Sequence, residues 1–184
     1  MSGNIKLAET AKELDACYQL RHKVFVEGDA RYAPQPGRRL LDRFDAYGTS
    51  RVFVAYEDQQ VVGTLRVSFD DADVGFPADE YFNFRSTLPR EGDFVSVSQL
   101  AVDPDRRGQL RVLNGLMMLL YYWVHMHQIS HVVVPFNPAL TKVMQRIGFQ
   151  KIGEVVTSAH YELEIQPMLL DIKDIRGSFI DFVA

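Results

Sequence analysis

The chain has 184 residues, which is long enough for one domain with a substantial core. It is 47% hydrophobic and 24% charged with a formal net charge of −4, and this mild acidity argues against a general nucleic-acid binder, which needs a broad basic face. The single cysteine, Cys17, excludes an internal disulfide and a cysteine-rich zinc site. It is consistent with a reducing cytoplasm.

The first residues lack the basic, apolar and small-residue order of a signal peptide, so we expect a cytoplasmic protein. The longest apolar run, residues 116–126, contains His125 and is too short to span a bilayer, which predicts no integral membrane segment. The histidines show no metal-ligand spacing, because His125 and His127 point apart on a helix. We therefore predict no metal site.

The first predicted elements are a strand over residues 4–7 and a helix that begins after Thr10. Thr10 and Glu13 have the spacing of a capping box, and apolar residues then recur at helical spacing. Arg21 interrupts this apolar stripe. Either its stem packs while its guanidinium reaches water, or it is a charged group beneath an active-site cleft.

Residues 28–50 are polar and rich in Gly and Pro, so we expect a loop with short helical pieces. Asp42 and Asp45 share a face if they lie on a helical turn, where they form a candidate site, a solvated charge cluster or a cap. Residues 51–56 and 61–69 read as two strands of a hairpin. Arg66 lies inside the second strand, and Asp42 or Asp45 is its expected partner.

The region over residues 94–126 is predicted to be a strand, a basic loop and a long helix. The strand ends at Asp103-Pro104, because proline has no N–H for a sheet ladder. The loop contains two arginines and a glycine, and the helix begins near Leu110 and is apolar almost all round, hence well buried. Backbone N–H groups at such a helix start favour phosphate binding.

The last third of the chain is predicted to alternate strands with one short helix. A central, parallel strand covers 131–135, and a helix opens at Asn137-Pro138 and stops at Gly148. Further strands are predicted over 149–156, 161–165 and 168–172, the last two as a closing pair or one bent strand, and the apolar tail is expected to dock. The apolar face predicted for the helix consists of Leu140, Val143, Met144 and Ile147.

The run Leu100-Ala101-Val102-Asp103-Pro104, followed by Arg107-Gly108, resembles the acyl-carrier loop of the GNAT superfamily of N-acyltransferases. The resemblance implies one α/β domain over residues 1–184, with a mixed central sheet, an antiparallel meander, splayed central strands and flanking helices. In that superfamily the splayed strand pairs with a pantetheine arm, and the loop and helix start cradle a pyrophosphate.

Leu110 and Val112 stand where the superfamily's loop usually has small residues. Their bulk would crowd a pyrophosphate, which favours acyl carrier protein, with a single phosphate on its phosphopantetheine, over coenzyme A as acyl donor. No tightly bound cofactor is expected, only this acyl thioester as co-substrate. The residues that the resemblance assigns to the donor are Leu100, Ala101, Val102, Arg106, Arg107, Gly108, Gln109, Leu110, Arg111 and Asn137.

Four short motifs in the same order resemble the acyl-homoserine-lactone synthases and, more closely, the long-chain N-acyl amino acid synthases, which both use acyl carrier protein. The motifs are Arg21-x-x-x-Phe25, Asp42-x-x-Asp45, Gly63-Thr64-Leu65-Arg66 and Ser98-Gln99-Leu100-Ala101-Val102. They imply substrate-binding roles for Arg21, Phe25, Asp42, Asp45 and Arg66. The lactone synthases have a Glu and an Arg where this chain has Ser96 and Gln99, which argues against lactone synthesis.

The resemblance implies an enzyme that moves a long-chain fatty acyl group from acyl carrier protein to the amine of an amino acid or related small molecule. The alternatives are a short-chain acyl-CoA N-acyltransferase and a non-catalytic domain that binds acyl carriers. Ser96, Ser98 and Gln99 are candidates to orient the amine, and His160 is either the candidate base or a structural histidine. Met144 occupies the place of the superfamily's usual acid, a tyrosine.

Overall fold

The computed structural model describes residues 4–88, 92–106, 110–158 and 163–175, with only the backbone described at residues 110 and 174. The chain divides into two compact units. The first unit comprises residues 1–67 and 99–121, and the second comprises residues 68–98 and 122–184. The expectation of a single domain stays a prediction.

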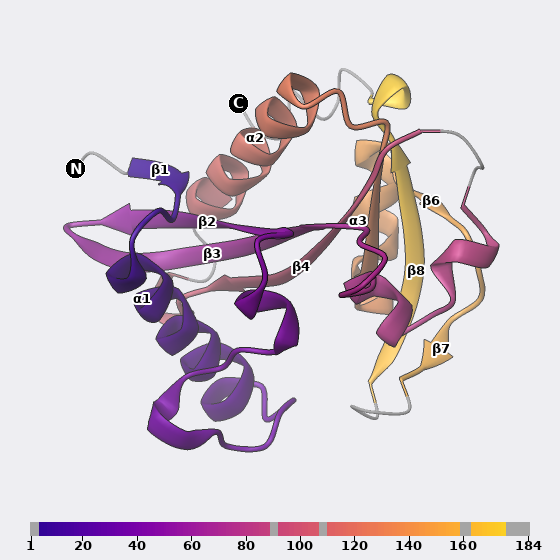
Figure 1. The fold of residues 1–184 in the computed structure, drawn as a ribbon. Helices are drawn as coiled ribbons and strands as arrows, with labels where there is room; N and C mark the ends of the chain where they lie inside the picture. Colours follow the sequence, from indigo (N-terminus) through magenta and orange to yellow (C-terminus); the bar gives the residue numbers. More distant parts are fainter. Residues whose placement is uncertain (1–3, 89–91, 107–109, 159–162, 176–184) are drawn as a thin grey trace. The chain divides into compact units, whose positions relative to one another are not determined.

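The first unit contains a sheet with the strand order β1-β2-β3-β4 (Figure 1). β1 pairs antiparallel with β2, and Asn4 lies opposite Tyr56. All four strands were predicted from the sequence with bounds that differ by no more than a residue at either end, because β2, β3 and β4 are runs rich in apolar and β-branched residues that end at polar or proline-containing turns. The strands are β1 (Asn4–Leu7), β2 (Ser50–Glu57), β3 (Gln60–Phe69) and β4 (Phe94–Val102), whose first half belongs to the second unit.

The helix α1 (Ala11–His22) begins at the predicted capping box. The Thr10 side chain accepts from the backbone N–H of Glu13, and the Glu13 carboxylate accepts from the backbone N–H of Thr10. Hydrogen bonds from Lys6 and from the backbone N–H groups of Glu9 and Thr10 lower the pKa of Glu13 to about 2. The sequence therefore fixes the start of α1 locally.

The end of α1 was not predicted, because the helix widens into a π-helical turn, η1 (Lys23–Gly28). There the backbone N–H of Asp29 donates to the carbonyl of Val24, five residues earlier, at 2.9 Å. A π turn accommodates one residue more than the 3.6-residue period on which the prediction relied.

Helices α1 and α2 (Leu110–Met126) cover opposite faces of the strands in the first unit. Cys17 of α1 packs against Val52 and Val54 of β2. On the other face, Gly63 of β3 lies so close to α2 that an added Cβ would be 2.5 Å from Val112 Cγ1. Successive strand residues face opposite sides, so Thr64 and Arg66 share the α1 face while Leu65 shares the α2 face.

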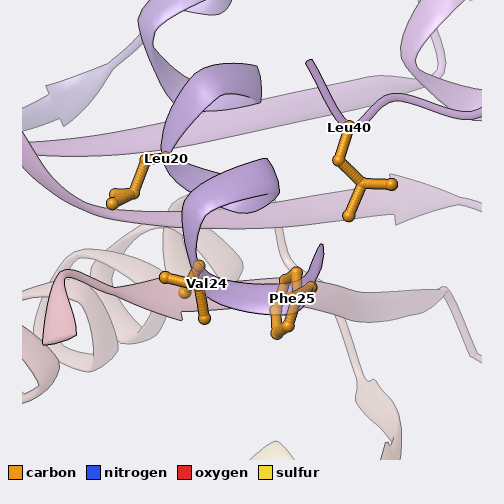
Figure 2. Close-up of a cluster of buried hydrophobic side chains, with 5 residues drawn as sticks. Leu20, Val24, Phe25 and Leu40 are labelled. Atoms are coloured by element: carbon orange, nitrogen blue, oxygen red, sulfur yellow. The ribbon is translucent and has the colours of Figure 1, made fainter. Parts of the chain in front are cut away.

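A second apolar cluster lies where the π turn meets the loop after it (Figure 2). Leu20 and Val24 come from the end of α1 and the π turn, and Leu40 comes from the loop that follows. Phe25 is 8% exposed and Ala101 of β4 is 1% exposed, so both belong to the core of this unit. This cluster anchors the loop that contains Asp42 and Asp45.

The second unit has the strand order β4-β5-β8-β6, and the short β7 pairs with β8. β5 lies between a parallel and an antiparallel neighbour, which confirms the predicted central, parallel strand. Its ladder with β4 has three pairs and ends at Ser96↔Val133, whereas its ladder with β8 continues to Phe136↔Gln166. The elements are β5 (His131–Phe136), α3 (Thr141–Ile147), β6 (Gln150–Lys151), β7 (Val156–Thr157) and β8 (Glu164–Asp171).

Two predictions for the last third of the chain were wrong, and one alternative was confirmed. The strand expected over 149–156 is two separate two-residue strands, β6 and β7, which pair with different parts of β8. Of the two alternatives for residues 161–172, the structure has the single strand, which begins at Glu164, while residues 159–162 and the tail lie outside the described part. Leu140 and Val143 are exposed rather than on an apolar face, because α3 has only two turns and buries Met144 and Ile147.

The remaining helical pieces are single turns, and two of them lie in the loop that the composition predicted over 28–50. α2 buries Leu116 and Val124 as expected, but its outer face exposes Tyr122 and Met126. No helix among the described residues has both the length and the apolar character to cross a membrane. The single turns are η2 (Pro36–Arg38), η3 (Arg43–Ala46), η4 (Pro77–Glu80), η5 (Phe84–Ser86), η6 (Pro104–Arg106), η7 (Pro138–Leu140) and η8 (Ile172–Asp174).

Candidate active site

The first unit contains a chain of alternating arginines and aspartates, which we call the Arg–Asp relay: Arg21, Asp45, Arg66 and Asp42. Arg21 Nη1 donates to Asp45 Oδ1 at 2.9 Å. Asp45 Oδ2 is 3.0 Å from Arg66 Nη1. Arg66 then reaches Asp42 through both terminal nitrogens, at 2.5 Å and 2.9 Å. The last pair is bidentate, the strongest geometry for a guanidinium and a carboxylate.

Three elements position the relay. Arg21 lies in the last turn of α1, and Arg66 lies on the face of β3 that α1 covers. The two aspartates form a capping box around η3: Asp42 accepts from the backbone N–H of Phe44 at 2.9 Å, and Asp45 accepts from that of Asp42 at 3.1 Å. The two carboxylates, three residues apart, therefore cap the start of the helical turn η3. The same turn presents both carboxylates to the arginines.

The relay is buried at one end and accessible at the other. The side chains of Arg21, Asp45 and Arg66 are 0%, 1% and 2% exposed, whereas that of Asp42 is 29% exposed. Two positive and two negative charges cancel, which is what makes burial of the three inner ionised groups tolerable. The open end at Asp42 is the part that a ligand can reach.

The charges of the relay set its ionisation. Burial opposes ionisation of Asp45, but the charges of Arg21 and Arg66 outweigh it and hold the pKa of Asp45 below its usual value. Burial likewise opposes the charge of Arg66, while Asp45 and Asp42 raise the pKa of its guanidinium. Asp45 and Arg66, at the centre of the relay, therefore stay charged at neutral pH.

Gln99 of β4 extends the relay at its accessible end. Its backbone has a φ of 54°, a left-handed conformation that is uncommon for a residue with a side chain. This conformation departs locally from the extended backbone of β4, which continues to Val102. Its Nε2 is 3.5 Å from Asp42 Oδ2, while its Oε1 is buried without a hydrogen-bond partner among the described residues. A buried polar atom without a partner is rare and calls for an explanation.

Five of the residues predicted from the sequence thus meet in one cluster: Arg21, Asp42, Asp45, Arg66 and Gln99. The expected pairing of Arg66 with Asp42 or Asp45 is confirmed with both. For Arg21, the reading in which the guanidinium reaches water is wrong, because the side chain is fully buried against Asp45. The helical spacing could not distinguish these readings, since it places a residue on a face without naming what covers that face.

The other predicted residues of β4 and the neighbouring loops lie apart from this cluster. Phe25 is in the apolar cluster of Figure 2, and the centroid of its ring is 6.1 Å from the centroid of the Tyr32 ring. Ser96 is fully buried, and its Oγ has no hydrogen-bond partner among the described residues. Ser98 is half-buried, and Asn137 is exposed and uses its side chain to accept from the backbone N–H of Ala139.

The structure describes only part of the loop that was predicted to bind the phosphate. Arg106 is 3.4 Å from Glu57 at the β2–β3 hairpin, and Ala101 is buried between Leu100 and Val102, which are half-buried. Val112 is buried, and Arg111 is exposed. The remaining predicted residues, Arg107, Gly108, Gln109, the side chain of Leu110 and His160, lie outside the described part.

The sequence reading missed two contacts at the π turn. Lys23 binds Asp103, at the end of β4, at 2.8 Å, and His22 Nδ1 is 3.1 Å from Glu27 Oε1. The His22–Glu27 pair is five residues apart, a spacing that only a π turn brings onto one face. Both pairs line a groove of about 970 Å³ along α1, but no member of the relay lines it, so this groove and the charged cluster are separate features.

The model of the N-acyl amino acid synthase FeeM family matches residues 16–171. The chain belongs to this family. The match includes the whole relay and Gln99, and it identifies the protein as an acyltransferase that transfers acyl groups to nitrogen. No curated protein sequence matches the chain.

Solved structures share the fold at low sequence identity. FeeM, an N-acyl amino acid synthase from uncultured soil microbes, is 17% identical with a TM-score of 0.76, and the alignment covers 94% of this chain and 92% of that one. The acyl-homoserine-lactone synthase LasI is 18% identical, with a TM-score of 0.73 and coverages of 93% and 90%.

A third similar structure is BjaI, a coenzyme A-dependent acyl-homoserine lactone synthase solved with SAM and isopentyl-CoA. It is 16% identical with a TM-score of 0.76, over 99% of this chain and 88% of that one. An acyl-CoA N-acyltransferase from Pseudomonas aeruginosa is also similar, at 22% identity and a TM-score of 0.66 over 92% and 98%. These likenesses confirm the predicted GNAT-like mixed α/β fold.

Proposed function

We propose that the protein transfers a long-chain fatty acyl group from the thioester of acyl carrier protein to the amine of an amino acid or a related small molecule. The observation that carries the proposal is the buried, charge-balanced relay that ends beside Gln99 on β4. Burying three ionised groups stabilises a fold poorly, so such a network is better explained by the positioning of polar groups for a substrate.

The reaction is aminolysis of a thioester. The amine nitrogen attacks the carbonyl carbon, the C–N bond forms, the C–S bond breaks, and the amine loses a proton as the thiolate leaves. A thioester is already activated, so holding the two reactants in line supplies much of the acceleration. We assign the backbone N–H groups of Leu100, Ala101 and Val102, after the left-handed Gln99, to the stabilisation of the developing oxyanion.

The proposed donor site consists of the second half of β4 and the basic loop after it. The ladder of β4 with β5 covers only three residues at the start of β4, so the edge of its second half is available for a pantetheine arm. The loop and the start of α2 would bind its phosphate. The residues assigned to the donor are Arg106, Arg107, Gly108, Gln109, Leu110, Arg111 and Asn137.

The proposed acyl pocket and the remaining polar groups complete the assignment. Leu65 and Leu116 are both fully buried and face the side of β3 that α2 covers, which suits an alkyl chain. Ser96 and Ser98 are candidates to orient the amine through their hydroxyls, and His160 is the candidate base. The proposal includes the cytoplasm as the location, where acyl carrier protein is available.

Acyl-CoA is the competing donor, because the similar synthase BjaI is coenzyme A-dependent. The experiment incubates the purified protein with a long-chain acyl carrier protein, or with the matching acyl-CoA, and a panel of amino acids and simple amines. Mass spectrometry then identifies any N-acyl product. We expect product from acyl carrier protein at a higher kcat/KM than from the coenzyme A thioester.

Two outcomes would contradict the proposal. Faster turnover of a short-chain acyl-CoA would assign the protein to the coenzyme A-dependent N-acyltransferases. Tight binding of acyl carrier protein without any N-acyl product, for every amine tested, would make it a non-catalytic carrier-binding domain.

A further inference from the structure

Besides the hydroxyls of Ser96 and Ser98, the accessible end of the relay supplies a candidate atom to bind the acceptor amine. Four donors already meet the two oxygens of Asp42. Its Oδ1 accepts from Arg66 Nη1 and from the backbone N–H of Phe44, and its Oδ2 accepts from Arg66 Nη2 and Gln99 Nε2. A carboxylate has about four lone-pair positions, so Asp42 has little capacity left for a further donor.

Asp42 in turn decides which end of the Gln99 amide points away from the relay. A carboxylate accepts only, so the NH₂ end must face it, and the opposite orientation would place two oxygens against each other. The Nε2 contact with Asp42 Oδ2 agrees with this orientation. The Oε1 atom is therefore directed elsewhere, and it is the acceptor of the cluster that lacks a partner.

The other unpartnered atoms of the cluster are donors in the interior. Arg21 Nε and Nη2 have no hydrogen-bond partner among the described residues, but the whole side chain is 0% exposed. Gln99, in contrast, is partly exposed and adjoins Asp42, the accessible member of the relay. Its contact with Asp42 is at the long end of the hydrogen-bond range, so a small rotation of the amide can meet an incoming donor.

We propose that Gln99 Oε1, which is buried while the rest of the side chain is partly exposed, turns toward the attacking amine and accepts a hydrogen bond from it, and that Asp42 and Arg66 act as positioning residues that hold the amide in this orientation. The inference rests on the proposed function and specifies its acceptor subsite. A neutral amide oxygen binds an N–H without removing its proton, so Gln99 orients the nitrogen lone pair toward the thioester and leaves the proton transfer to another group or to water.

The test replaces Gln99 by methionine, which conserves side-chain length and volume but cannot accept this bond. Gln19→Met is the matched control, because Gln19 also donates its amide to an aspartate, Asp15, outside the cluster. Each protein is assayed for N-acylation across amine concentrations and for the slow hydrolysis of the acyl donor by water. Urea unfolding midpoints confirm that both variants are folded.

The expected result for Gln99→Met is a loss of roughly tenfold or more in kcat/KM for the amine, the effect of one hydrogen bond to a substrate, with donor hydrolysis and the donor KM unchanged. Gln19→Met should match the wild type. Wild-type transfer with an unchanged amine kcat/KM in Gln99→Met would overturn the inference alone. An equal loss of amine transfer and donor hydrolysis would also overturn it, and a wild type that acylates no amine would overturn the proposed function as well.

Discussion

Asp45 lies between two buried guanidinium groups and is itself 1% exposed, so the stability of the relay depends on its negative charge. Removing one partner of a buried ion pair leaves an uncompensated charge, which costs more than the pair contributed. The lowered pKa of Asp45 expresses the same dependence as a function of pH.

Asp45→Asn is expected to lower the free energy of unfolding at pH 7 by roughly 3–5 kcal/mol, the cost of breaking a buried ion pair. Because the native pKa of Asp45 is lowered, its stabilisation is complete above the unfolded value and is lost as the pH falls through the native one. The gap between wild type and variant should therefore shrink below about pH 4. Urea titrations at several pH values measure this gap, and a gap that does not depend on pH would contradict the ionised state.

Arg66→Ala is expected to release Asp42 and Asp45 and to disorder the acceptor subsite while the donor subsite stays intact. The amine KM should rise and kcat should fall, with the KM of the acyl donor little changed. Steady-state kinetics with each substrate varied in turn measures both effects. Arg85→Ala is the control, because Arg85 also contacts two aspartates but is 50% exposed, and wild-type kinetics in Arg66→Ala would separate the relay from acceptor use.

The sequence predicts the ion-pair partners of Arg66 better than it predicts the burial of Arg21. A charged residue inside an alternating strand has to meet an opposite charge, and the nearby loop offered only a few candidates. Arg21 lies on a helix, where a long side chain can equally reach solvent. Its burial follows from the loop over 28–50 folding back on α1, which no local pattern reveals.

At the scale of elements, the start of α1 is the part of the fold that the sequence specifies most directly. Thr10→Ala removes one half of the capping box and is expected to destabilise the protein by about 1 kcal/mol. Thermal or urea unfolding measures this loss. Thr10→Ser keeps the hydroxyl and should retain most of the stability, whereas equal losses in both variants would show that the cap contributes little.

Elements whose form depends on distant partners were predicted less well. β6 and β7 are two-residue strands because each pairs with a different part of β8, and a sequence window shows only one continuous apolar stretch. The π turn after α1 escaped notice for a related reason: the helical period predicts contacts at three or four residues, not at five. The hairpin strands β2 and β3 of the first unit were predictable because their apolar runs and the polar turn between them are local features of the sequence.

At the scale of the whole molecule, the donor and acceptor subsites are assigned to different stretches of one strand, β4. Its first half pairs with β5, and Gln99 and the residues after it belong to the unit that contains the relay. The superfamily resemblance identified this strand from Leu100 to Val102, but the sequence could not show that its ladder with β5 ends after three pairs. The point where this ladder ends depends on how β5 pairs with β4 on one side and with β8 on the other, and both strands are distant from β5 in the sequence.

Arg107→Ala tests the donor assignment independently of the relay. If Arg107 binds the phosphate of phosphopantetheine, its loss should raise the donor KM about tenfold or more and lower kcat much less, because this contact is equally strong in the ground state and the transition state. Kinetics with acyl carrier protein as the varied substrate measures both constants. A donor KM equal to that of the wild type would remove Arg107 from the phosphate site, while Arg43→Ala serves as the control for lost positive charge.

The wide turn at Lys23–Gly28 has a consequence for how the chain tolerates insertion and deletion. Such a turn is equivalent to one residue added to a regular helix. Deleting a single residue there would restore ordinary winding and keep the following residues in phase, because the wide turn already takes up the extra residue. Glu27 would then stand four residues after His22, a spacing that an ordinary helical turn also brings onto one face. A deletion in the regular turns of α1 would instead rotate all following residues by about 100° around the axis, including the loop that carries the two aspartates. The acceptor subsite should therefore tolerate a one-residue deletion in this wide turn better than one in the turns before it.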